Sequence, residues 1–107
     1  MGKYDKEAKE LLSAIGGREN VSAVTHCATR MRFVLNDPKK ADEATIENIP
    51  VVKGMFTNAG QFQVIIGNLV MMFLYSTMIL LQYLDYLGFL KKMRNQLRNK
   101  TKIQYNV

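Results

Sequence analysis

The chain has 107 residues and a formal net charge of +6, and 48% of its residues are hydrophobic. This length and composition predict one small globular domain with its own core. A single cysteine and a single histidine exclude an internal disulfide and the usual zinc-binding patterns, so we expect neither a metal nor another cofactor.

The positive charge is concentrated in the C-terminal part of the chain. Residues 1–67 carry nine Lys or Arg and eight Asp or Glu residues, whereas residues 68–107 carry six basic residues and only Asp85. A nucleic-acid-binding domain would carry its basic patch on the folded unit. We therefore expect no nucleic-acid partner.

The first predicted element is a helix in residues 4–17, YDKEAKELLSAIGG. Its apolar residues recur with the 3.6-residue period of an α-helix, and paired glycines can end it. The residues expected to face the core are Tyr4, Ala8, Leu11, Leu12 and Ile15, and the terminating glycines are Gly16 and Gly17.

Two short strands follow in residues 21–26 and 30–35 and are joined by the turn HCAT. Side chains alternate across a strand, so Arg30 and Arg32 share one face, next to the turn that carries Cys27. The opposite face is expected to enter the core with Met31, Phe33 and Leu35.

A second helix is predicted in residues 36–49, with Asp37 as its cap and Pro38 in its first turn. Two more strands, in residues 51–57 and 61–67, surround the hairpin turn NAG. Hairpin-joined strands are antiparallel, so the element order predicts an α/β sandwich with helices on one face of the sheet.

The residues around Cys27 are suited to phosphoryl chemistry. Cationic neighbours such as Arg30 and Arg32 favour the nucleophilic thiolate, and the planar guanidinium matches phosphoryl oxygens. The backbone of Ala28 and Thr29 can form an anion-binding nest. A buried structural cysteine beside a solvated arginine face remains the alternative.

The stretch HCATRMRF resembles the active-site segment of IIB domains in the glucose–sucrose–trehalose class of sugar phosphotransferase systems. AIGGRENV and VVKGMFTNAGQFQVIIG are similar to segments before and after that site, in register, and the resemblance covers almost all of residues 5–67. FTNAGQFQVIIG looks closest to trehalose transporters, with sucrose-type relatives as the main competitor. The resemblance implies an α+β fold with a four-stranded antiparallel sheet and helices packed on one face (a split α/β sandwich).

The resemblance also implies a mechanism. In this family, a phosphohistidine on a IIA protein or domain phosphorylates the IIB cysteine, which then phosphorylates a sugar presented by the membrane-embedded IIC domain. The family cysteine corresponds to Cys27, the two arginines, needed chiefly in transfer to sugar, to Arg30 and Arg32, and the hydroxyl residue to Thr29. The implied partners are IIA, IIC and a sugar, with trehalose favoured over sucrose. The implied location is the cytoplasmic face of a bacterial cell membrane, and this chain alone would be cytoplasmic or membrane-associated.

Three further residues are candidates for supporting the site. His26 would tune the thiol, or would be an exposed bystander. Gly54 would let the third strand pass close to the site, and Gln61 would face the arginines. For Gly54 and Gln61 we favour the structural explanations, a bulge and a solvent-facing strand residue respectively.

The chain departs from the family pattern after Gly67, where family members continue with an acidic amphipathic helix and a linker. Residues 69–90 are apolar and are followed by three cations, as in a transmembrane helix with cytoplasmic flanking charge. Gln82 and Asp85 count against that interpretation.

A reading-frame slip is the second explanation, and we favour it. Met71, Met72 and Phe73 require the bases ATG ATG TT, which encode Asp and Val when shifted by one base. Permissive codons downstream give an acidic, amphipathic segment with glycines, similar to the family's third helix. We therefore expect residues 1–67 to form the IIB phosphocysteine domain and residues 68–107 to be an aberrant frameshifted tail.

The tail also has consequences for solubility and function. Leu69, Phe73 and Leu80 are expected to cover the sheet and to leave an exposed apolar patch. The alternative function is an inactive truncated remnant or a small membrane-anchored interaction protein.

Overall fold

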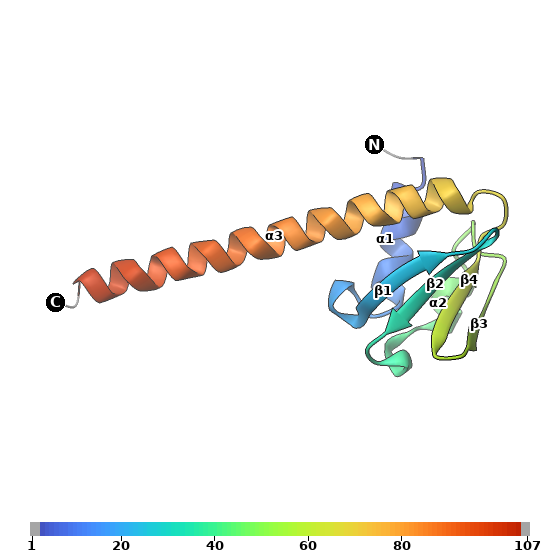
Figure 1. The fold of residues 1–107 in the computed structure, drawn as a ribbon, viewed down its shortest axis with the longest axis horizontal. Helices are drawn as coiled ribbons and strands as arrows, with labels where there is room; N and C mark the ends of the chain where they lie inside the picture. The colour runs from blue at the N-terminus through green and yellow to red at the C-terminus, as the bar shows by residue number, and fades with distance from the viewer. Residues whose placement is uncertain (1–2, 106–107) are drawn as a thin grey trace.

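The computed structural model describes residues 3–105. Residues 1 and 2 of the predicted domain 1–67, and residues 106 and 107 of the predicted tail 68–107, lie outside the described residues. A small sheet carries its helices on one face, and one long helix projects far beyond it (Figure 1). The elements are α1 (Asp5–Ala14), η1 (Arg18–Asn20), β1 (Val21–His26), β2 (Arg30–Leu35), η2 (Pro38–Lys40), α2 (Glu43–Glu47), β3 (Gly54–Asn58), β4 (Gln61–Ile65) and α3 (Val70–Tyr105).

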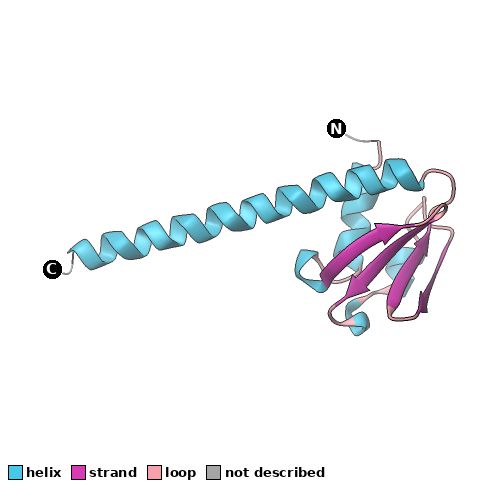
Figure 2. Cartoon of the chain, in the orientation of Figure 1, coloured by secondary structure: helices cyan, strands magenta, loops and turns pink. Residues whose placement is uncertain are grey.

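The sheet has the strand order β1-β2-β4-β3, and every neighbouring pair is antiparallel (Figure 2). The predicted α+β fold is therefore confirmed, and β1 and β2 have the predicted bounds. The predicted alternation in β2 also holds. The core-facing side of the sheet is fully buried at Met31, Phe33 and Val64. Arg30 and Arg32 lie on the other side, which we call the open face.

The predicted first helix is confirmed as α1, and all five of its expected core residues are buried. It ends at Ala14, and Gly16 follows with a φ of 111°, so close to Asn20 that an added Cβ would stand 2.7 Å from Nδ2. Asn20 is itself buried: its Nδ2 donates to the carbonyl oxygens of Ile15 and Asp37, and its Oδ1 accepts from Asp37 N–H. One amide thus fixes the path from α1 into the sheet.

The single helix predicted in residues 36–49 is wrong. Asp37 caps only the 3-10 turn η2, and the chain is extended at Asp42 before α2 begins. Asp42 is a second cap, because its Oδ1 accepts from Thr45 N–H at 3.3 Å and its Oδ2 from the Thr45 hydroxyl at 2.7 Å. Its own N–H donates to the Ala14 carbonyl oxygen at 2.8 Å. Two caps in succession divide the segment.

The second hairpin is confirmed, but its strands are shorter than predicted. Residues 51–53 precede β3, and β4 ends at Ile65, before Gly67 turns the chain with a φ of 87°. The turn has φ values of 52° at Ala59 and 78° at Gly60. Two successive residues with positive φ are the feature of a type I′ hairpin turn.

The first half of α3 packs on α1 and on the core-facing side of the sheet, and the second half projects into solvent (Figure 1). Phe73 is fully buried and Leu80 is half-buried, as expected, whereas Leu69 is exposed. The expected exposed apolar surface is present along α3. Its large exposed side chains in α3, with 39–64% exposure, are Met71, Met72, Tyr75, Met78, Tyr83, Tyr86, Leu87, Phe89, Leu90, Met93 and Leu97.

Candidate active site

Cys27 lies at the tight turn between β1 and β2, at one end of the sheet. Its backbone N–H donates to the Arg30 carbonyl oxygen at 3.0 Å. The Thr29 carbonyl oxygen accepts from the N–H groups of Ile66 and Gly67 at 2.9 and 2.8 Å. These hydrogen bonds hold the turn against the residues that follow β4, while the Cys27 side chain stays partly exposed at this end of the sheet.

The turn favours the ionised form of the thiol. Hydrogen bonding from the Thr29 backbone lowers the pKa of Cys27 most, and partial burial opposes this change. The Arg30 backbone lowers the pKa further, as do the hydrogen bond and the positive charge of the Arg32 side chain. Backbone dipoles and one guanidinium thus converge on sulfur, as an anion requires.

Arg32 is the arginine whose side chain acts on the thiol. It lies in β2 opposite Thr25 of β1 and Gln63 of β4, in the middle of the open face. Its Nε is buried and has no hydrogen-bond partner among the described residues. A buried donor without a partner is costly, so Arg32 is well suited to bind an anion arriving next to Cys27.

Arg30 points across the sheet instead. Its Nη1 donates to Gln63 Oε1 at 3.1 Å, and its guanidinium lies 5.1 Å from the centre of the Phe56 ring. Since Phe56 is opposite Gln63 in the β3–β4 pair, the Arg30 side chain reaches across β4 to β3. Sequence spacing correctly placed both arginines on one face but did not show that their side chains take different directions.

The other candidates divide into near and distant residues. Ala28 is exposed and Thr29 half-buried, both in the Cys27 turn. His26 is exposed, pairs with Met31 on the core-facing side, and has its Nδ1 3.2 Å from the Cys27 carbonyl oxygen. It is not among the groups that shift the Cys27 pKa.

Gly54 and Gln61 lie at opposite ends of the second hairpin, and Gly54 is in the row of Arg30, because Ile65 pairs with both. Gly54 pairs with Ile65 in regular register, without a bulge, and an added Cβ would stand 3.4 Å from Ile65 Cδ1. Gln61 pairs with Asn58 beside the β3–β4 turn, which is the end of β4 remote from the Cys27 turn.

The residue that sequence reasoning missed is Gln63. Gln61 and Gln63 are two apart in one strand and share a face, so only the register of β4 against β2 distinguishes them. That register pairs Arg32 with Gln63, and it could not be derived from the separate hairpins.

The arrangement brings a partly exposed thiol, backbone groups of its turn and the Arg32 side chain together at one end of the sheet. Within residues 3–105, no three His, Cys, Asp or Glu side chains are placed to hold a metal ion. A surface hollow lies between α1 and α2, lined by residues such as Lys9, Lys40 and Asn48. It is on the helix side of the sheet, and Cys27 is not among its lining residues.

Comparisons with known proteins give the family. The sequence model described as "phosphotransferase system, EIIB" matches residues 9–42. The trehalose-specific EIIBC component of Bacillus subtilis is 51% identical over 67 residues, which is 63% of this chain and 14% of that protein. The Escherichia coli trehalose-specific EIIBC component is 60% identical over 57 residues, which is 53% of this chain and 12% of that protein. The sucrose-specific EIIBC component of Staphylococcus xylosus is 52% identical over 65 residues, covering 61% and 14% of the two chains.

A solved structure agrees with these relatives. The crystal structure of one domain of the phosphotransferase-system IIabc component from Clostridium difficile has a TM-score of 0.66 and 37% identity. The match covers 69% of this chain and 78% of that one. The chain spans 12–14% of the length of the three curated relatives named above. The chain belongs to the EIIB family of the phosphotransferase system, and it has homology to trehalose- and sucrose-specific EIIBC components and to a beta-glucoside-specific EIIBCA component.

Proposed function

We propose that Cys27 accepts a phosphoryl group from a phosphohistidine of a IIA component and passes it to a sugar held by a IIC component. The observation that carries the proposal is the convergence of Thr29 and Arg30 backbone groups and the Arg32 side chain on a partly exposed thiol. A thiolate is the reactive form of cysteine, and an exposed rim is accessible to a protein donor.

In the first transfer, the Cys27 sulfur supplies the electron pair of a new P–S bond. The P–N bond breaks, and its electrons stay on the imidazole nitrogen, which leaves as neutral imidazole when the other ring nitrogen carries a proton. The phosphoryl oxygens can then accept hydrogen bonds from Arg32, whose buried Nε has no partner among the described residues. Positioning and charge neutralisation are the main demands of phosphoryl transfer.

In the second transfer, a sugar hydroxyl oxygen forms the P–O bond as the P–S bond breaks. Sulfur leaves as the thiolate, which the same turn stabilises. The hydroxyl proton passes to a base that the sugar-binding component supplies. Arg30 and Arg32 balance the charge on the phosphoryl group during this step.

We favour trehalose over sucrose, because two of the three curated relatives named above are trehalose-specific and one is sucrose-specific. The site would work at the cytoplasmic face of a bacterial cell membrane, where IIC presents the sugar. The IIC component is either a separate chain or a further part of the same protein.

The test is phosphorylation by a labelled phospho-IIA protein. Label should enter the unmodified chain and should be absent from Cys27→Ser. Cys27 is the only cysteine, so prior alkylation of the thiol should block labelling as well. Label retained in Cys27→Ser would refute the assignment.

A second candidate function is membrane-anchored interaction without catalysis. The segment Val70–Lys100 is long and apolar enough to cross a bilayer, judged by length and composition. Against this, Val70, Phe73 and Leu81 are buried in the domain core, and insertion would expose their partners. A spanning α3 would keep the chain with membranes through a carbonate wash, whereas the docked α3 would release it.

A further inference from the structure

We propose that Gln63 is a positioning residue, which holds the Arg30 guanidinium ready for the transfer of the phosphoryl group from Cys27 to the sugar. The inference rests on the proposed function and extends it to a residue outside the Cys27 turn. Gln63 acts through Arg30 and need not touch the phosphoryl group.

The burial of Gln63 is the first observation. Its residue exposure is 3%, although it lies on the open face, where no helix covers the sheet. Its cross-strand neighbours are Arg32 on one side and Phe56 on the other. Buried amides need hydrogen-bond partners, and the carbonyl oxygen of Gln63 has one in Arg30 Nη1.

The second observation is that Arg30 is held from two strands. Gln63 Oε1 accepts one of its hydrogen bonds, and the Phe56 ring lies 5.1 Å from the guanidinium carbon. A guanidinium has five N–H donors, so one bond to Gln63 leaves others for phosphoryl oxygens. Restricting a long side chain before the reaction lowers the entropy cost of using it.

The neutrality of the amide is the third part of the argument. A glutamate at this position would form an ion pair with Arg30 and offset the charge that the phosphoryl group needs. It would also place a negative charge on the open face that receives an anion. Glutamine fixes the guanidinium and leaves its charge uncompensated.

The experiment separates the two transfers. Gln63→Met keeps the length of the side chain but removes the acceptor, and Gln63→Glu adds charge. The matched controls are Gln61→Met and Gln61→Glu, in the same strand and on the same face, beside the β3–β4 turn. Phosphorylation of Cys27 by phospho-IIA and transfer from phosphorylated Cys27 to trehalose, in membranes that contain a trehalose-type IIC component, are timed separately.

For Gln63→Met, transfer to sugar should slow by about tenfold or more, the loss expected when a hydrogen bond to a charged group disappears. Phosphorylation of Cys27 should change by less than about threefold, because that step depends chiefly on the thiolate that the Cys27 turn stabilises. Gln63→Glu should slow transfer to sugar at least as much, and both Gln61 variants should match the unmodified chain.

A double-variant cycle tests whether Gln63 works through Arg30. In an Arg30→Gln background, Gln63→Met should add little further loss. Full additivity, equal slowing of both transfers, or the same effect from the Gln61 variants would overturn the inference while leaving the proposed function intact. Absence of either transfer in the unmodified chain would overturn the proposed function, and this inference with it.

Discussion

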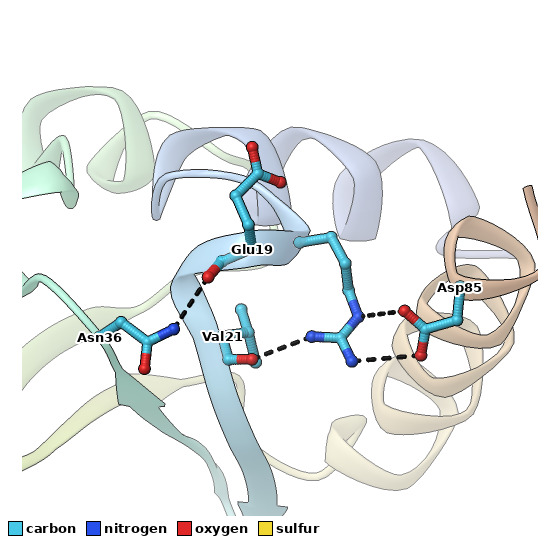
Figure 3. Close-up of polar contacts among 5 residues, drawn as sticks. Glu19, Val21, Asn36 and Asp85 are labelled. Atoms are coloured by element: carbon cyan, nitrogen blue, oxygen red, sulfur yellow. Dashed lines mark hydrogen bonds and ion pairs between the residues drawn. The ribbon is translucent and has the colours of Figure 1, made fainter. Parts of the chain in front are cut away.

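Arg18 and Asp85 are joined by two hydrogen bonds, from Nε to Oδ1 at 2.8 Å and from Nη2 to Oδ2 at 3.1 Å (Figure 3). A third nitrogen of Arg18 donates to the Val21 carbonyl oxygen at 2.9 Å. The contact links the turn after α1 to the middle of α3. It gives the one acidic residue of the predicted tail a partner at the aqueous surface, where an acid is tolerated.

This pair should contribute little to stability. The side chains of Arg18 and Asp85 are 36% and 57% exposed, so water and salt screen their attraction. Asp85→Asn should reduce the free energy of unfolding by about 0.2–1 kcal/mol, less at high salt. Urea unfolding of Arg18→Gln, Asp85→Asn and the double variant measures the pair, with Lys91→Gln as a surface control. A loss above about 2 kcal/mol would contradict a screened surface pair.

The docking of α3 is tested by two phenylalanines of the same helix. Phe73 is fully buried and its ring lies 6.3 Å from that of Tyr4, whereas Phe89 is 57% exposed. Phe73→Ala should cost about 3–5 kcal/mol of unfolding free energy, and Phe89→Ala should stay within about 0.5 kcal/mol. Equal effects in thermal and urea unfolding would mean that α3 does not pack as described.

The local pattern of this sequence was enough to place most elements. Alternation in residues 30–35 predicted which side of β2 enters the core, and the period of residues 4–15 predicted the buried stripe of α1. Both depend on side chains within one element. The joining of β2 to β4, the burial of Gln63 and the direction of Arg30 depend on pairing between distant segments, which no single stretch encodes.

The prediction of a single helix in residues 36–49 was wrong for a different reason. Asp37 followed by Pro38 is a good helix start, but Asp42 is another, and only tertiary contact decided between one long helix and a 3-10 turn followed by a short helix. The hydrogen bond from Asp42 N–H to the Ala14 carbonyl oxygen fixes the extended conformation there. Asp42 was recognisable as a possible helix cap, but no feature of the neighbouring residues favoured it over Asp37 as the start of a helix.

The capping role of Asp42 gives a pH-dependent prediction. Hydrogen bonds from the Thr45 hydroxyl and backbone lower the pKa of Asp42 below its ordinary value of 3.8. A carboxyl with a lowered native pKa adds stability above its unfolded pKa, and this is lost as pH falls through the native pKa. Asp42→Ala should therefore be less stable than the unmodified chain at pH 7, and the difference should shrink below about pH 4. Urea midpoints at both pH values test this, with the neighbouring Glu43→Gln as the control. A difference independent of pH would rule the charge out as its cause.

The frameshift explanation for residues 68–107 remains a prediction. We expect the nucleotide sequence across codons 67–75, read one base out of frame, to encode an acidic segment, and a IIC-coding frame found downstream would establish a split gene. Sequencing the gene and its flanking region measures this directly. Stop codons throughout the shifted frame would count against a recent frameshift. Residues 68–107 would then be encoded in the gene's original frame, with α3 as part of the normal protein.

The reactivity of Cys27 should reveal how the turn acts on sulfur. Thr29 and Arg30 backbone groups and the Arg32 side chain lower the pKa of Cys27 from its ordinary value of 9.0. Only the thiolate reacts rapidly with iodoacetamide, so the alkylation rate should rise with pH around a midpoint below that of the urea-unfolded chain. Arg32→Gln should move the midpoint upward, because it removes a cation and a donor. Arg30→Gln should leave the midpoint nearly unchanged, because the Arg30 side chain is directed toward Gln63 and Phe56. If both variants raised the midpoint equally, the two arginines would not divide their roles as the open face indicates.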